Sequence, residues 1–253
     1  MDKKFVIKWV TFCGCGALIF SVIAAFMIAN RLKNGGENYV SADDLSVVDT
    51  VSPVDFASTE DDDTVSEPPA IPPGDEEFVC VTDYISDIRV ELKYASADNF
   101  TGERIYDFDK AYLRYGTVKK LLQAQQKLRE RGFCLKIWDA FRPVSAQFKL
   151  WEICPDPKYV SNPNKKYSSH SRGNTVDVTL VDSHGNEAVM PTDFDDFTAL
   201  ADRDYADIKN QTARENALLL ESIMQECGFK PYSGEWWHFS DTDEYDVSKD
   251  FTP

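Results

Sequence analysis

The sequence predicts an α+β fold for a single domain that covers residues 78–253. Three observations favour this fold class. Helix-like and strand-like patterns alternate irregularly, without the regular strand–helix–strand units that build a doubly wound parallel sheet. The segment has 176 residues, a length typical of one domain. No internal repeat is present, so a solenoid fold is not expected.

The first predicted elements are a helix, a strand and a short second helix. Apolar residues recur at helical spacing from Val118 to Leu128, and Gly132 stands where this helix should end. Residues 133–138 then indicate a strand, because Phe133, Leu135 and Ile137 would lie on one of its faces. Pro143 is placed to begin the short helix, because proline is tolerated in the first helical turn.

The second half of the domain predicts a strand, a helix and a final strand. Residues 176–181 are rich in β-branched side chains and indicate the first of these strands. Thr212 and Glu215 have the spacing of a capping box, so we expect the helix to begin there and to end at Gly228. Residues 235–240 are the last strand-like segment.

The N-terminal segment, residues 1–33, is predicted to be a membrane anchor. Residues 9–29 form an apolar run of 21 residues without a charge, and about 20 apolar residues span a bilayer. The alternative is a cleaved secretory signal, but the small-residue pair Ala24-Ala25 is a poor cleavage site. Three lysines precede the run, against Arg31 and Lys33 after it, which favours the N-terminus inside and the bulk outside.

Residues 34–77 are predicted to be a disordered linker. They carry thirteen acidic and no basic residues, and few large apolar side chains that could form a core. As a flexible coil the segment would span roughly 35–40 Å, and self-repulsion would extend it. We interpret it as a spacer; an acidic tail that binds a partner is the alternative.

The charge of the chain excludes one class of partner. The formal net charge is −16, of which residues 1–33 contribute +4, the linker −13 and the domain −7. Nucleic-acid binding needs clustered lysine and arginine, so nucleic acid is not expected as the main partner. A basic patch confined to one site stays possible.

Four cysteines belong to the predicted domain: Cys80, Cys134, Cys154 and Cys227. An even number permits two disulfides, with three possible pairings that the sequence does not distinguish. Four buried thiols, as in a cytosolic protein, are the alternative. If the domain lies outside the membrane, we expect at least one disulfide. No pair has the C-x-x-C spacing of a metal site.

Two of the three histidines stand close to carboxylates. His170 precedes Asp177 by seven residues, and Glu235 precedes His238 by three. Two histidines and one carboxylate can hold Zn²⁺ and leave a fourth position for water, as in a catalytic zinc site. Glu235 would then be free to act as the general base. Each residue also has an ordinary structural interpretation, so the spacing alone does not establish a site.

These segments resemble the D-alanyl-D-alanine dipeptidases, zinc enzymes of the vancomycin-resistance type. The family belongs to a wider group of D,D-carboxypeptidase and hedgehog-like folds, which implies a central, mainly antiparallel sheet flanked by helices. The resemblance extends over about residues 85–251. The matching blocks are residues 93–102 (KYASADNFTG), 138–143 (WDAFRP), 168–180, 194–195 and 228–239.

The resemblance implies a role for each matching residue. His170, Asp177 and His238 correspond to the ligands of one zinc ion, and Glu235 corresponds to the catalytic base. Arg142 corresponds to the arginine that stabilises the oxyanion formed from the scissile carbonyl; its alternative is a structural ion pair with Asp139, and both can hold. The residues assigned to the substrate pocket are Tyr94, Ser168, Asp195 and Asp139.

The assignment of Asp195 depends on a one-residue gap in the match. Asp195 would hold the free ammonium group of the dipeptide. Its neighbour Asp196 is the reserve candidate, and a solvated acidic side chain is the structural alternative. The third histidine, His184, lies in a turn sequence and matches no motif, so it is expected on the surface.

The resemblance and the predicted anchor together imply a bacterial membrane protein with a single transmembrane helix and an extracytoplasmic catalytic domain. The best-known relatives are cytosolic, so a role in antibiotic resistance is not implied. The predicted substrate is the D-Ala-D-Ala dipeptide. The alternatives are a D,D-carboxypeptidase that trims peptidoglycan stem peptides and a non-catalytic zinc-containing binding module. The oligomeric state stays open.

Overall fold

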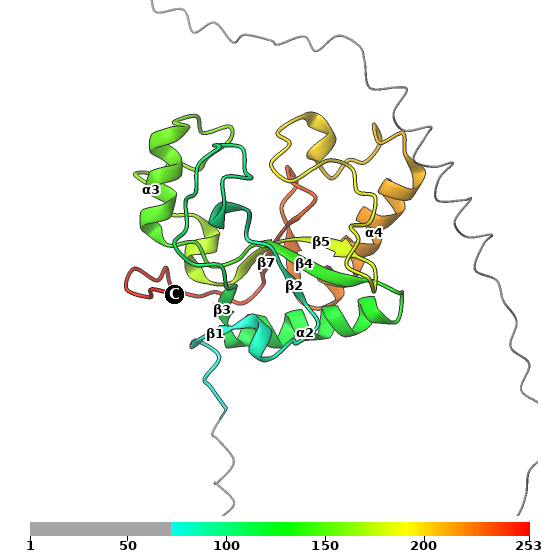
Figure 1. Ribbon diagram of the computed structural model, residues 1–253, viewed down its shortest axis with the longest axis horizontal. Coiled ribbons are helices and arrows are strands. Elements are labelled where there is room, and N and C mark those ends of the chain that lie inside the picture. The colour runs from blue at the N-terminus through cyan, green and yellow to red at the C-terminus, as the bar shows by residue number, and fades with distance from the viewer. Residues whose placement is uncertain (1–71) are drawn as a thin grey trace, which may run out of the picture. The chain divides into compact units, whose positions relative to one another are not determined.

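In the computed structural model, which describes residues 72–253, five strands form one mixed sheet in the order β2-β4-β5-β7-β6 (Figure 1). β2 pairs with β4 in parallel, whereas the other neighbouring strands are antiparallel. β1 (Phe78–Cys80) and β3 (Tyr112–Arg114) form a separate antiparallel pair. The bounds are Arg89–Val90 (β2), Cys134–Asp139 (β4), Thr175–Val181 (β5), Phe229–Pro231 (β6) and His238–Asp241 (β7).

Two long helices cover the sheet. α2 (Tyr115–Arg129) packs on β4, and α4 (Gln211–Glu226) packs on β5, on β6 and on α2. The shorter α3 (Val144–Ile153) lies apart from both, on the left of Figure 1. Short 3-10 helices complete the set: η1 (Val81–Asp83), η2 (Lys93–Ala95), η3 (Ser169–Arg172) and η4 (Ala199–Ala201). The predicted α+β content is therefore confirmed.

Strand β5 is buried along its whole length. Successive side chains of a strand point to opposite faces of its sheet. Val178 belongs to the hydrophobic core that also contains Leu121 of α2 and Leu220 of α4. Asp177, one residue earlier, therefore points to the other face, where it lines a cleft. The core fixes which side chains of this strand are available for chemistry.

The domain begins a few residues before the predicted boundary at residue 78. The carbonyl of Asp75 accepts from the amide of Gly116 at 3.0 Å, and that of Glu77 accepts from Tyr115 at 2.8 Å. Lys119 forms an ion pair with Asp75 at 2.6 Å. These contacts join residues 75–77 to the first turn of α2.

The C-terminal segment, residues 242–253, folds back over the turn formed by η3. The amide of Ser248 donates to the carbonyl of Ser171 at 2.9 Å. The ring of Phe251 stacks on Phe78, with 4.0 Å between their centroids. This segment therefore supports η3 on the side of β1.

The predicted capping box at the start of α4 is wrong. The helix begins at Gln211, and its N-cap is Asn210, whose side chain accepts from the amide of Ala213 at 3.3 Å. Glu215 instead accepts from the side chain of Gln211 at 2.7 Å. Thr212 is already inside the helix, because Asn210, two positions earlier, accepts from a free amide of the first turn and so takes the capping role.

The expectation of a disulfide is also wrong for the described residues, in which all four cysteines are free thiols. They lie in different surroundings. Cys227 is buried in the core next to α4, the thiol of Cys134 lies 3.8 Å from a carboxylate oxygen of Asp87, and that of Cys80 lies 3.2 Å from the hydroxyl of Thr82. The two-disulfide framework that the count permits is not formed.

The predicted anchor, residues 1–33, and most of the linker, residues 34–77, lie outside the described residues. Among the helices of residues 72–253, none is long and apolar enough to cross a bilayer. The membrane anchor stays a prediction from the sequence.

Gly173 is the position at which a side chain should be least tolerated. It ends η3 with a φ of +75°, and a Cβ atom there would lie 2.3 Å from the ring of Phe78. Gly132 has a similar φ of +80° but open space around it. We expect Gly173→Ala to lower the free energy of unfolding by about 1–3 kcal/mol more than Gly132→Ala does. Urea unfolding of both variants measures the difference; equal losses would contradict the close contact with Phe78.

Candidate active site

Three predicted ligands meet where η3, β5 and β7 come together. Asp177 lies on β5, and His238, the first residue of β7, is its direct partner across the antiparallel pair. His170 comes from η3, just before β5 in the chain. The left-handed Gly173 lets the chain turn from η3 into β5. Sheet register and one turn thus bring together residues up to 68 positions apart.

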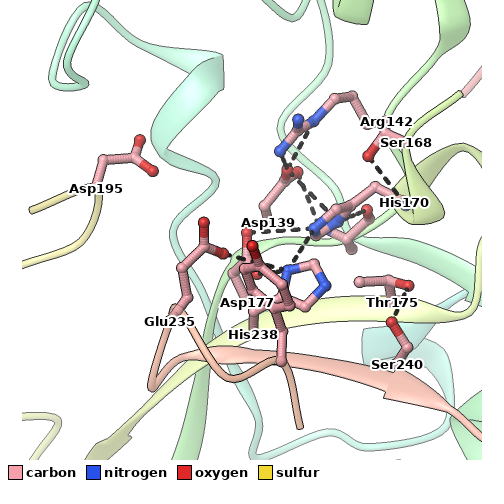
Figure 2. Close-up of polar contacts among 12 residues, drawn as sticks. Asp139, Arg142, Ser168, His170, Thr175, Asp177, Asp195, Glu235, His238 and Ser240 are labelled. Atoms are coloured by element: carbon pink, nitrogen blue, oxygen red, sulfur yellow. Dashed lines mark hydrogen bonds and ion pairs between the residues drawn. The ribbon is translucent and has the colours of Figure 1, made fainter. Parts of the chain in front are cut away.

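The ligand atoms of these residues all lie within 4.8 Å of one another (Figure 2). His170 Nε2 is 3.4 Å from both His238 Nδ1 and Asp177 Oδ2. His238 Nδ1 is 3.0 Å from Asp177 Oδ1. His170 and Asp177 are buried, and His238 is only slightly exposed. The geometry is that of a group that could hold one metal ion.

The hydrogen bonds around this group fit a metal ion. His170 Nδ1 lies 2.8 Å from the carbonyl oxygen of Ala140, so this nitrogen carries the proton and Nε2 keeps its lone pair. Asp177 Oδ1 is a buried oxygen that accepts no hydrogen bond of good geometry, although His238 Nδ1 lies 3.0 Å away. A buried polar atom without a partner is costly unless another group binds it. A cation between the three ligand atoms would satisfy it.

The electrostatics of the group also favour a cation. Burial alone would raise the pKa of Asp177, but His170 and His238 outweigh burial and hold this pKa well below its ordinary value. Burial likewise opposes the charged form of His170, yet Asp177 and Asp139 raise its pKa. The carboxylate is therefore ionised and strongly attracts positive charge at this point.

Glu235 lies in a turn before β7 and not in the predicted strand 235–240, because β7 begins only at His238. Its amide donates to the carbonyl of Tyr232 at 3.4 Å. Glu235 Oε2 lies 3.6 Å from His238 Nδ1 (Figure 2). Burial is the largest influence and raises the pKa of Glu235 above its ordinary value. A carboxylate with such a pKa, beside the ligand group, is suited to accept a proton.

Arg142 is held in place by two side chains. Its Nη2 lies 2.6 Å from Asp139 Oδ2, and its Nη1 donates to Gln147 Oε1 at 2.8 Å. Burial opposes the charge of the guanidinium, but Asp139 and neighbouring groups raise the pKa of Arg142 well above its ordinary value. Arg142 is therefore a fixed cation on the wall of the cleft.

The predicted contact between Asp139 and the substrate is corrected by the structure. Asp139 is fully buried and does not line the cleft. Its Oδ1 accepts from Tyr106 Oη and from the amide of Ala140, and its Oδ2 accepts from Arg142. Because its oxygens are occupied, Asp139 orients Arg142, the structural alternative considered from the sequence.

Two further predicted pocket residues, Tyr94 and Asp195, contact each other. Tyr94 Oη donates to Asp195 Oδ2 at 2.9 Å. Burial raises the pKa of Asp195 to about 8. In Figure 2 the Asp195 carboxylate lies across from Glu235, away from His170. The reserve candidate Asp196 does not line the cleft; its side chain accepts from the amide of Thr198 instead.

A cleft of about 890 Å³ contains the site. This volume is near the upper end of the range for pockets that hold drug-sized ligands. Ser168 lines the cleft and also caps η3 by accepting from the amide of His170. The predicted site residues that line it are Tyr94, Arg142, Ser168, His170, Asp177, Asp195, Glu235 and His238. His184 lies on the surface, with 83% of its side chain exposed, as expected from the sequence.

Three supporting residues were missed from the sequence. Gln147 connects Arg142 to the carbonyl of Ser161, and Tyr106 donates to the buried Asp139. Arg203 donates to the carbonyls of Tyr232 and His238 and so fixes both ends of the segment with Glu235. Nothing in a single sequence marks Gln147 or Tyr106 as part of the site. Arg203 could have been noticed, because it is the single basic residue among six acidic ones in residues 193–207.

The chain matches a family model described as "D-ala-D-ala dipeptidase" over residues 75–252. A D-alanyl-D-alanine dipeptidase of Escherichia coli (strain K12) is 39% identical over 163 residues, which are 64% of this chain and 83% of that protein. One from Streptomyces coelicolor is 34% identical, over 65% and 91% of the two chains. One from Enterococcus faecium is 31% identical, over 66% and 92%.

Two solved structures are similar at a lower level. One is a mutant of the vancomycin resistance D,D-pentapeptidase VanY from the VanB-type cassette, in complex with Zn(II). It has 13% identity and a TM-score of 0.37, over 62% of this chain and 80% of that chain. The other is VanYB in complex with D-alanine-D-alanine, with 15% identity and a TM-score of 0.34, over 64% and 79%.

The raised pKa of Asp195 predicts a pH-dependent loss of stability. In the folded protein this carboxyl group stays protonated up to about pH 8, whereas an unfolded chain ionises it near pH ~4. The folded state therefore binds more protons over this interval, and its stability falls as the pH rises towards 8. Asp195→Asn removes this loss but can still accept a hydrogen bond from Tyr94.

We expect the free energy of unfolding of Asp195→Asn, relative to the parent protein, to increase between pH 5 and pH 8 and to level off above. Urea titrations of the metal-free proteins at several pH values measure this difference. A difference that is constant with pH would show that Asp195 ionises normally.

Proposed function

The chain belongs to the D-ala-D-ala dipeptidase family, and from this premise we propose that it hydrolyses the D-Ala-D-Ala dipeptide to two D-alanine molecules, with zinc as its cofactor and Glu235 as the general base. The observation that supports this mechanism most directly is the position of Glu235. Its carboxylate lies beside the three converging ligand residues and inside the same cleft. A metal site that only stabilises a fold needs no such base.

His170 Nε2, Asp177 and His238 Nδ1 are the atoms that would hold the zinc ion. Two histidines and one carboxylate are a common ligand set for a catalytic zinc and leave a position open. When bound, the metal supplies a Lewis acid that polarises the scissile carbonyl and lowers the pKa of water towards ~7.

Glu235 moves the proton in this mechanism. Its raised pKa lets Oε2 take the proton of the attacking water and then give it to the nitrogen of the leaving D-alanine. The backbone bond from Glu235 to Tyr232 and the bonds from Arg203 keep the carboxylate next to His238.

Arg142 and Asp195 bind opposite charges of the substrate. Arg142, held by Asp139 and Gln147, stabilises the negative charge that develops on the carbonyl oxygen, without having to reorient during the reaction. Asp195, oriented by Tyr94, accepts the ammonium group of the dipeptide. Binding of that cation favours the ionised form of a carboxyl group that burial otherwise keeps protonated at neutral pH.

A second candidate is a D,D-carboxypeptidase that removes D-alanine from peptidoglycan stem peptides. The observation in its favour is the cleft volume of about 890 Å³, which exceeds the needs of a dipeptide. The predicted anchor and spacer, residues 1–77, would place the domain at the outer face of a bacterial membrane, close to such peptides. The dipeptide is preferred because Asp195 lines the cleft and would bind a free ammonium group.

The substrate is tested by measuring D-alanine release from D-Ala-D-Ala and from a stem pentapeptide that ends in D-Ala-D-Ala, using the zinc-loaded protein. We expect turnover of the dipeptide, because only the dipeptide would bring a free ammonium group next to Asp195. Preferred turnover of the pentapeptide would instead support the carboxypeptidase. Activity on neither peptide would contradict both functions.

The roles of base and ligand are separated by two variants. Glu235→Ala should reduce kcat by about 100-fold or more while it keeps one bound zinc, because only the proton acceptor is removed. His170→Ala should lose the metal itself. Zinc content by atomic absorption and D-alanine release are measured together, with His184→Ala as the control from the surface. Full activity of Glu235→Ala would contradict its role as the base.

A further inference from the structure

Three aromatic side chains from distant segments meet beside the cleft. The ring of Phe197 lies 5.4 Å from that of Phe100 and 4.9 Å from that of Tyr159, measured between centroids. We call these three residues the aromatic bridge. Phe197 and Tyr159 both line the cleft, from two different loops, so their contact joins its two sides.

The backbone around Asp195 directs the side chains of Phe194 and Phe197 to different neighbours. Asp195 has a φ of +56°, a left-handed conformation that is uncommon outside glycine. Phe194 packs inward on Trp138 and Trp237, at 5.3 and 5.6 Å. Phe197 packs on the aromatic bridge instead. In the chain, Asp195 therefore stands between a residue of the aromatic core and a residue of the aromatic bridge, and its carboxylate accepts from Tyr94.

The loop that carries Tyr159 has its own supports. The amides of Tyr159 and Val160 both donate to the carbonyl of Asp156 at 3.0 Å. Gln147, which also holds Arg142, donates to the carbonyl of Ser161 at 2.8 Å. The position of Tyr159 is thus set from the same helix, α3, that positions the arginine of the site.

The aromatic bridge lies near Asp195, and both line the same cleft. Phe197 follows Asp195 by two residues, and Tyr94, which donates to Asp195, also contacts Phe100 at 6.3 Å between ring centroids. The cleft is also lined by residues 240–244, at the end of β7 and just after it, so Asp195 and the aromatic bridge border only part of it.

We propose that the aromatic bridge closes the cleft beyond Asp195 and so restricts the enzyme to D-Ala-D-Ala peptides with a free amino group. The proposal rests on the dipeptidase function above and adds a steric determinant to the charge of Asp195. A dipeptide bound through its ammonium group has no atoms beyond Asp195. A peptide extended at its amino end must place an amide and further atoms where the rings of Phe197 and Tyr159 meet.

The test compares free D-Ala-D-Ala with N-acetyl-D-Ala-D-Ala, the smallest substrate with an extended amino end. In Phe197→Ala and Tyr159→Ala, the ratio of kcat/KM for the acetylated over the free dipeptide should rise by roughly tenfold or more, because the obstructing ring is removed. Tyr159→Phe keeps the ring and should keep the ratio. Phe148→Ala, an exposed aromatic residue of α3 outside the cleft lining, controls for the general loss of an aromatic side chain.

A binding measurement keeps the proposal testable apart from catalysis. Calorimetric titration of both peptides into zinc-loaded Glu235→Gln protein, with and without Phe197→Ala, should show that the second change improves the affinity for the acetylated peptide only. An unchanged ratio and unchanged affinities in folded variants would overturn the proposal, as would equal use of both peptides by the parent protein. Loss of all hydrolysis with selective binding retained would instead overturn the proposed reaction.

Discussion

The pairing of Asp177 with His238 across β5 and β7 is the constraint on which the site depends. In an antiparallel pair, directly opposed residues point to the same face of the sheet, so this register alone brings a carboxylate and an imidazole to 3.0 Å. A slip of one residue would turn the side chains of one strand to the opposite face. The core holds the register, because Val178 and Phe239 next to these residues are completely buried. The packing that stabilises the sheet therefore also fixes the positions of Asp177 and His238.

A second buried carboxylate, Asp139, organises the positive side of the cleft. A buried charge is tolerated only when it is paired and hydrogen-bonded, and Asp139 meets both conditions through Tyr106, the amide of Ala140 and Arg142. It also lies 3.6 Å from His170 Nδ1. One residue that cannot touch a substrate therefore influences both the arginine and the first ligand. Its fixed geometry keeps the guanidinium on the wall of the cleft, where a more flexible cation would have to be ordered during each turnover.

The sequence could predict the parts of this molecule that rest on local patterns or on ordered motif blocks. The periodic apolar residues of 118–128 indicate α2, and the β-branched run near Val178 indicates β5, because each pattern reflects a buried face. It could not distinguish Asn210 from Thr212 as the cap of α4, since both residues suit that position. The burial of Asp139 was also beyond reach, because its partner Tyr106 lies 33 residues away. The aromatic bridge was not foreseen for the same reason: its three rings are distant in sequence and meet only in the folded chain.

The attachment of residues 75–77 to the start of α2 has a mechanical consequence. If a tether precedes the domain, any pull on it enters the fold at Asp75, where the backbone bond to Gly116 and the ion pair to Lys119 are the first contacts to carry load. The next element to be loaded is β1, which pairs with β3. A force along β1 would load the hydrogen bonds of this pair together, in shear, and would not break them one at a time. The load therefore passes into a long helix and a separate two-stranded sheet. The strands that hold Asp177 and His238 belong to the other sheet, so tension would reach them only indirectly, through α2 and through β3, whose Arg114 amide donates to the carbonyl of Gly173 at 2.8 Å.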